Sequence, residues 1–163
     1  MEIPIVVPND DHIMEELVFN TRFHDVDTLV GNVPENILQF DQLNAFGAML
    51  QNSISASPAL RSYVLKLWRA TKNPTDYGVK VSGVDMKRLV LSGASPRGMG
   101  MVLRAARVNA WLNERTAVLP EDIHDVFHST VAHRLVFSPV YEMRRTEIAR
   151  EMLSGIVNSI AAP

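Results

Sequence analysis

The chain has 163 residues, of which 47% are hydrophobic and 21% are charged, and it contains no cysteine. This composition is typical of a globular protein that buries a core, and it excludes a disordered chain, a disulfide framework and thiolate catalysis. No apolar run approaches the roughly 20 residues of a transmembrane helix. The N-terminus also lacks the basic and apolar regions of a signal peptide, so we expect a cytoplasmic protein without membrane contact.

Charge is segregated along the chain, although the net charge is only −2. Residues 1–41 carry nine acidic side chains and one basic one, whereas residues 61–115 carry eleven basic side chains and three acidic ones. A basic middle segment indicates an anionic partner, such as a nucleotide phosphate, a nucleic acid or an acidic neighbour. Pairing of opposite charges within the fold explains the segregation equally well, and a pI of 6.2 argues against a strongly electrostatic nucleic-acid binder.

Residues 1–40 are predicted to contain a strand, a helix and a connector. The β-forming residues of segment 1–8 lie between prolines, which favours one short strand. No later segment offers an obvious partner, so we expect this strand to complete the sheet of another domain. Asn9 or Asp10 then caps a helix, and residues 24–36 are predicted to be a connector because they include Gly31 and Pro34.

Residues 41–163 are predicted to form a helical domain. Helix starts are indicated at five places, Asp41, Ser57-Pro58, Ser95-Pro96, Leu119-Pro120 and Thr146 with Glu147. Residues 79–91 fit either a short helix or an extended segment. The longest helix is expected over residues 96–114, and its second half is predicted to be buried on more than one face because it carries Val108, Trp111 and Leu112. The predicted fold class is therefore mainly α, with five or six helices and one short N-terminal strand.

Most motifs of a self-sufficient enzyme are missing. The glycines never form GxxxxGK[ST] or GxGxxG, so neither standard phosphate loop is encoded. His124 and His128 have the i, i+4 spacing of a metal site, but the zincin pattern requires Glu where Asp125 stands. Two histidines on a polar helix face are the more common explanation. A metal-dependent hydrolase remains an alternative that metal analysis would test.

The turn Ser95-Pro96-Arg97 carries the most specific chemistry. With Ser95 as the N-cap, Arg97 lies in the first helical turn, where an acidic residue is electrostatically preferred. An anion outside the chain would account for this cation, because the guanidinium and the helix amides could bind it together. Gly98 and Gly100 follow and weaken the helix. A surface arginine in a loose helix start is the alternative explanation.

The segment 92–143 resembles the C-terminal lid of MoxR-like AAA+ ATPases. Four motifs carry the resemblance in order, and they are Gly93-Ala94-Ser95-Pro96-Arg97, Leu103-Arg104-Ala105-Ala106-Arg107, Val118-Leu119-Pro120-Glu121-Asp122-Ile123 and His133-Arg134-Leu135-Val136-Phe137-Ser138-Pro139. Weaker similarity extends over residues 41–71 and to the C-terminal hydrophobic tail. The start of the chain resembles the last strand of the ATPase core and the helix after it. The resemblance therefore implies the end of a core over residues 1–40 and an AAA+ lid-type helical bundle over residues 41–163.

Members of this family hydrolyse ATP with Mg²⁺ in a ring, typically a hexamer, and act as chaperones with regulatory roles, frequently beside von Willebrand factor A-domain partners. The arginine of their Ser-Pro-Arg turn is the sensor-2 residue, which reaches the γ-phosphate of ATP from the lid. The resemblance assigns that role to Arg97 and places Ser95 beside the nucleotide.

This sequence departs from the family pattern because Walker A, Walker B, sensor 1 and the arginine finger are absent from it. Gly98 and Gly100 also replace an alanine-rich run. We therefore expect a lid domain without its ATPase core, either as a truncated gene product or as an isolated piece. Such a chain would be inactive alone and would bind no cofactor by itself. The alternative is a free-standing helical interaction or nucleic-acid-binding regulatory module.

Overall fold

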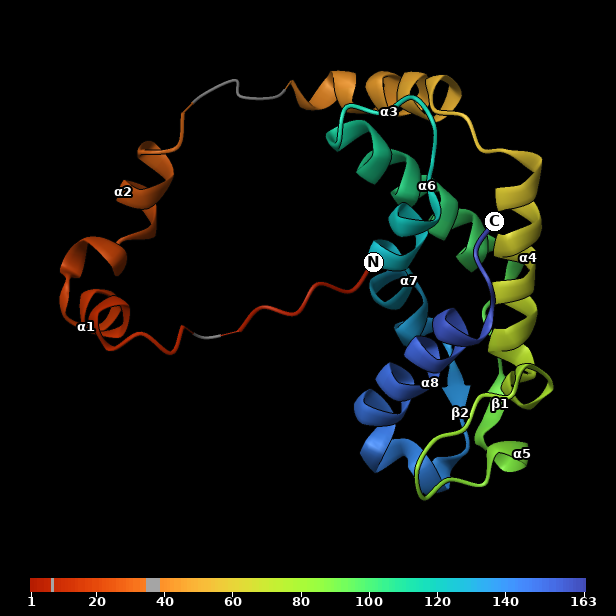
Figure 1. The fold of residues 1–163 in the computed structure, drawn as a ribbon. Coiled ribbons are helices and arrows are strands. Elements are labelled where there is room, and N and C mark those ends of the chain that lie inside the picture. The colour runs from red at the N-terminus through yellow and green to blue at the C-terminus, as the bar shows by residue number, and fades with distance from the viewer. Residues whose placement is uncertain (7, 35–38) are drawn as a thin grey trace. The chain divides into compact units, whose positions relative to one another are not determined.

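The computed structural model describes residues 1–6, 8–34 and 39–163, and its regular structure is mainly α-helical (Figure 1). The predicted fold class is therefore confirmed. Contacts divide the described chain into two compact units, which are Ile3–Phe46 and Met1–Glu2 together with Gly47–Pro163.

The smaller unit contains two helices that begin at aspartates. α1 (Asp11–Phe19) follows Asp10, whose carboxylate accepts hydrogen bonds from two amides of the first turn, as its predicted capping role requires. α2 (Val26–Gly31) begins in the same way at Asp25, after a short 3-10 turn (Thr21–Phe23). The prediction of a connector over residues 24–36 is therefore wrong where α2 forms. Its residues 35 and 36 lie outside the described chain.

The larger unit contains the helical structure from Gly47 onward, so the boundary between the units falls within the next helix. α3 (Leu43–Ser53) follows a 3-10 turn (Phe40–Gln42) that contains the predicted cap Asp41. The elements after it are α4 (Pro58–Lys72), a 3-10 turn (Pro74–Tyr77), α5 (Met86–Leu89), β1 (Val90–Ser92), α6 (Pro96–Leu112), α7 (Pro120–Val131), a 3-10 turn (Ala132–Arg134), β2 (Val136–Phe137), a 3-10 turn (Pro139–Arg144) and α8 (Arg145–Ser159).

Three of the larger unit's helix starts follow the predicted serine or proline signals. Ser57 and Ser95 cap α4 and α6 with their hydroxyl oxygens, and Pro120 is the first residue of α7. α8 differs, because it begins at Arg145 without a side-chain cap. Thr146 lies inside its first turn rather than capping it.

The ambiguous segment 79–91 contains both a helix and a strand. α5 ends at Leu89, and β1 begins at the next residue and pairs antiparallel with β2, with Val90 opposite Phe137. Sequence patterns missed this small sheet because β2 has only two residues.

The predicted strand over residues 1–8 does not form in the part of the segment that the structure describes, which is residues 1–6 and Pro8. Val7 lies outside the described residues. A strand requires a hydrogen-bonded neighbour. Among the described residues, the two strands of the sheet, β1 and β2, pair with each other.

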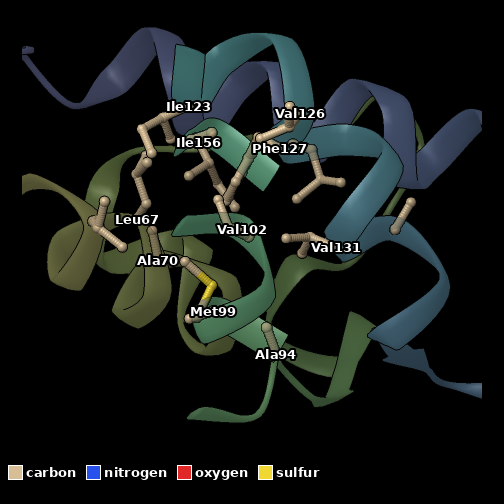
Figure 2. Close-up of a cluster of buried hydrophobic side chains, with 14 of the residues drawn as sticks. Leu67, Ala70, Ala94, Met99, Val102, Ile123, Val126, Phe127, Val131 and Ile156 are labelled. Atoms are coloured by element: carbon tan, nitrogen blue, oxygen red, sulfur yellow. The ribbon is translucent and has the colours of Figure 1, made fainter. Parts of the chain in front are cut away.

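The core of the larger unit lies between α4, α6, α7 and α8. Figure 2 shows apolar side chains from these four helices meeting, among them Leu67, Val102, Phe127 and Ile156, and all four are almost fully buried. Each such side chain stabilises the fold by about 1.5–3 kcal/mol through the hydrophobic effect.

The second half of α6 is not buried on several faces as predicted. Val108, Trp111 and Leu112 are 39%, 43% and 66% exposed, respectively, and the buried stripe of α6 instead runs through Met99, Val102, Ala106 and Ala110. Apolar composition alone predicted too much burial here, since exposed apolar residues are common on protein surfaces.

Candidate functional site

The start of α6 has the local geometry that its sequence predicts. Ser95 is the N-cap, and its hydroxyl oxygen accepts a hydrogen bond from the amide of Gly98 at 3.1 Å. Pro96 occupies the first helical position, where its lack of an N–H group costs no hydrogen bond. The Ser95 carbonyl accepts from the amide of Met99 at 3.1 Å, which closes the first helical turn.

Arg97 lies in this first turn, and its side chain is exposed. It makes no hydrogen bond or ion pair with another residue in the described part of the chain, apart from the helical bonds of its backbone. Proline has no amide hydrogen and the Gly98 amide is already bonded to Ser95, so few amides of this turn can face an outside anion. The guanidinium of Arg97 is therefore the main anion-binding group that the turn offers.

Both backbone groups of Ala94, the residue before the N-cap, are hydrogen-bonded to side chains of α4. The amide of Ala94 donates to the hydroxyl oxygen of Thr71 at 3.1 Å, and the indole Nε1 of Trp68 donates to the carbonyl of Ala94 at 2.7 Å. The Thr71 hydroxyl in turn donates to the carbonyl of Trp68 at 2.7 Å. Since the Ala94 side chain is fully buried as well, this residue is fixed at both backbone groups and at its methyl group.

Gly93 lies directly against the end of α4. A Cβ atom there would stand 2.8 Å from the carbonyl oxygen of Thr71 and 2.8 Å from the amide nitrogen of Lys72. Both are backbone atoms of α4 and cannot move aside easily. Only glycine fits, and the segment before Arg97 is therefore packed backbone to backbone against α4.

Arg134 packs over the other side of the first turn. A Cβ atom at Gly98 would lie 3.0 Å from Cδ of Arg134, and Nε of Arg134 donates to the carbonyl of Thr130 at 3.0 Å. Arg134 thus bonds a carbonyl at the end of α7, as basic residues near helix C-termini often do. The sequence pattern did not indicate that its side chain lies beside Gly98.

The histidine pair has no third candidate metal ligand beside it in the described part of the chain. His124 and His128 are both exposed, and Nε2 of His124 is hydrogen-bonded with the hydroxyl of Tyr63 at 2.8 Å. No cluster of three or more His, Asp or Glu side chains suited to a metal ion occurs within residues 1–6, 8–34 and 39–163. Burial raises the pKa of Tyr63 above its ordinary value.

A buried carboxylate that the sequence did not single out joins α6 to α7. Asp122 accepts two hydrogen bonds from the guanidinium of Arg115, at 2.7 and 2.8 Å. It also accepts from the amide of Leu119 at 2.8 Å and from Nδ2 of Asn109 at 3.0 Å. A carboxylate with four donors has no free lone pair for catalysis, so its role is structural.

None of the helices in the described ranges has the length and apolarity needed to cross a bilayer.

Comparison with known proteins shows which proteins the chain is similar to. Residues 86–153 match the family model of the AAA lid domain. Over its whole length the chain is 42% identical to the protein MoxR of Methylorubrum extorquens and 40% identical to that of Paracoccus denitrificans. The chain spans about half of these relatives, 48% of each.

Two further matches are more distant. Chaperone MoxR1 of Mycobacterium tuberculosis is 33% identical over 64% of the chain and 26% of that protein. A crystal structure provisionally described as that of an ATPase from Cytophaga hutchinsonii matches with a TM-score of 0.62 and 28% identity, over 71% of this chain and 33% of that one. Over its whole length the chain is therefore a homologue of part of the MoxR proteins, and it resembles the lid domain of MoxR-like AAA+ ATPases.

Proposed function

We propose that residues 41–163 act as the lid of a ring-forming ATPase and that Arg97 is its sensor-2 arginine. The observation that carries the proposal is the exposed guanidinium of Arg97, which has no side-chain partner among the described residues and stands on a turn anchored to α4. A cation in the first turn of a helix is electrostatically unfavourable unless an anion lies nearby. The γ-phosphate of ATP bound to the ATPase core is that anion in our proposal.

The chemistry of this role is electrostatic. In phosphoryl transfer, negative charge spreads over the oxygens of the transferred group, and a positioned arginine stabilises that charge. Ser95 would lie beside the same phosphate. Its hydroxyl group can still donate a hydrogen bond while its oxygen accepts one from the Gly98 amide and so caps α6. The lid offers no acidic cluster for Mg²⁺ among its described residues, so the metal would be held by the core and by the phosphates.

The whole protein would hydrolyse ATP with Mg²⁺ in a ring, typically a hexamer, in which each lid contacts its own core and a neighbouring subunit. The name of the M. tuberculosis relative supports a chaperone role. A protein with a von Willebrand factor A domain is a further partner that we propose.

A turnover measurement tests the role of Arg97. The chain would be joined to the part of M. extorquens MoxR that it does not match, and ATPase rates of this core-joined protein would be compared with those of its Arg97→Ala variant. Loss of one positioned charge should lower kcat at least about tenfold. Arg104→Ala is the matched control, since Arg104 is an exposed arginine two turns further along the same helix. Unchanged turnover and nucleotide affinity in Arg97→Ala would overturn the proposal.

A further inference from the structure

Thr71 is a buried polar residue whose hydrogen bonds join two elements. The structure also buries Asp122 and Thr130. Among the described residues, the hydroxyl of Thr130 bonds to carbonyls of its own helix, those of Val126 and Phe127. The hydroxyl of Thr71, in contrast, bonds to the Trp68 carbonyl within α4 and accepts from the amide of Ala94 outside it.

The bond from Ala94 has no substitute in this environment. Ala94 and Thr71 are both 0% exposed, so water cannot replace the hydroxyl as the acceptor for the Ala94 amide. The hydroxyl is also oriented, because its own hydrogen is directed to the Trp68 carbonyl and its lone pairs therefore face the amide. Removing it would leave a buried donor without a partner and would loosen the chain at Ala94.

Ala94 lies three residues before Arg97, and only the capped first turn separates them. Arg97 extends from that turn into solvent without a described partner of its own. The direction of its side chain is therefore set by the backbone that carries it. That backbone is fixed to α4 at Gly93, by close packing, and at Ala94, by the hydrogen bonds from Thr71 and Trp68.

We propose that Thr71 is a positioning residue for Arg97. Thr71 holds the turn Ser95-Pro96-Arg97 against the last turn of α4, so that α4 and the start of α6 move as one body. This inference rests on the proposed function of Arg97. It implies that a movement of α4 would bring Arg97 toward the nucleotide or away from it.

The test compares isosteric threonine variants. Thr71→Val removes the hydroxyl and keeps the shape, Thr71→Ser restores the hydroxyl, and Thr130→Val is the matched control with a buried hydroxyl that does not touch the turn. In the 163-residue chain, hydrogen exchange of the Ala94 amide should become at least about tenfold faster in Thr71→Val, and it should stay slow in Thr71→Ser and Thr130→Val.

In the core-joined protein, Thr71→Val should lower kcat about tenfold and, like Arg97→Ala, weaken binding of a non-hydrolysable ATP analogue more than binding of ADP, because the displaced guanidinium loses its contact with the γ-phosphate. Thr71→Ser should retain most of the rate. In an Arg97→Ala background, Thr71→Val should cause no further loss, since both changes remove the same interaction.

The outcomes separate the two proposals. If Arg97→Ala slows turnover and Thr71→Val behaves like Thr130→Val, the positioning role is wrong and the sensor role stands. If the effects of Thr71→Val and Arg97→Ala multiply, Thr71 acts through stability rather than through Arg97, and the inference is again overturned. If Arg97→Ala alone has no effect, the sensor role fails, and the inference that depends on it fails too.

Discussion

Three glycines around the start of α6 meet different surroundings, and each has a different consequence. Gly93 packs against backbone atoms of α4, Gly98 lies beside the flexible side chain of Arg134, and Gly100 has open space where a Cβ atom would stand. Sequence reasoning treated Gly98 and Gly100 as equally loosening and did not single out Gly93. The distinction depends on what the glycine faces, which is a property of the packed structure.

Gly93→Ala should destabilise the fold by about 1–3 kcal/mol, because the new methyl group overlaps the backbone of Thr71 and Lys72. Gly100→Ala should stabilise it by up to about 1 kcal/mol, because alanine is the better helix former and meets no obstacle. Urea unfolding of both variants measures the two free energies. Equal effects at the two positions would contradict the packing described for Gly93.

At the scale of elements, the junction between α6 and α7 depends on Asp122 and its donors. Its bidentate pair with Arg115 joins the segment after α6 to the first turn of α7, and Asn109 adds a bond from within α6. The sequence predicted the start of α7 from Pro120. It did not predict the buried carboxylate, because Asp122 is also an ordinary acidic residue for a first helical turn.

Asp122→Ala should lower the free energy of unfolding by about 3 kcal/mol, since it leaves the partly buried Arg115 and the Leu119 amide without their acceptor. Asp125→Ala is the matched control, because this exposed carboxylate also accepts from Asn109, at 2.9 Å, and its loss should cost less than about 1 kcal/mol. Thermal or urea unfolding gives both values. A cost for Asp122→Ala no larger than for the control would contradict its bridging role.

The bond between α4 and α7 through Tyr63 and His124 should show in alkaline unfolding. Burial raises the pKa of Tyr63 in the folded protein above the ordinary value of 10.0. The neutral phenol therefore contributes stability that is complete below about pH 10 and is lost as the pH rises through the folded pKa.

Tyr63→Phe should cost about 1 kcal/mol near pH 8 through the lost hydrogen bond. The difference from the parent protein should shrink above pH 10, because phenylalanine does not ionise. Unfolding free energies at pH 8 and near pH 11 test this, and a difference that grows with pH would contradict it.

At the scale of the molecule, the helices could be predicted where a strong start signal agrees with apolar spacing, which is a capping side chain at α1, α4 and α6 and a proline at α7. α2 was missed because Gly31 and Pro34 outweighed the cap at Asp25, and β1 with β2 was missed because pairing between distant short segments leaves no periodic signal. Arg97 could be singled out because a cation at a helix start breaks a local rule. Its anchors Thr71 and Trp68 could not, because their bonds join residues more than twenty positions apart.

The chain alone should show no measurable ATPase activity and at best millimolar affinity for ATP, because its 163 residues encode no phosphate loop and the lid offers one exposed arginine at the candidate site. Isothermal titration with ATP and a phosphate-release assay test this. Micromolar affinity would mean that the chain holds a nucleotide site of its own.

The central claim is that Arg97 contacts the γ-phosphate, and the most direct measurement compares affinities for a non-hydrolysable ATP analogue and for ADP in the core-joined protein. ADP lacks the phosphate that a sensor arginine would bind. Arg97→Ala should therefore weaken the analogue about tenfold or more and leave ADP nearly unchanged. Equal changes for the two nucleotides, or no change for either, would contradict the account.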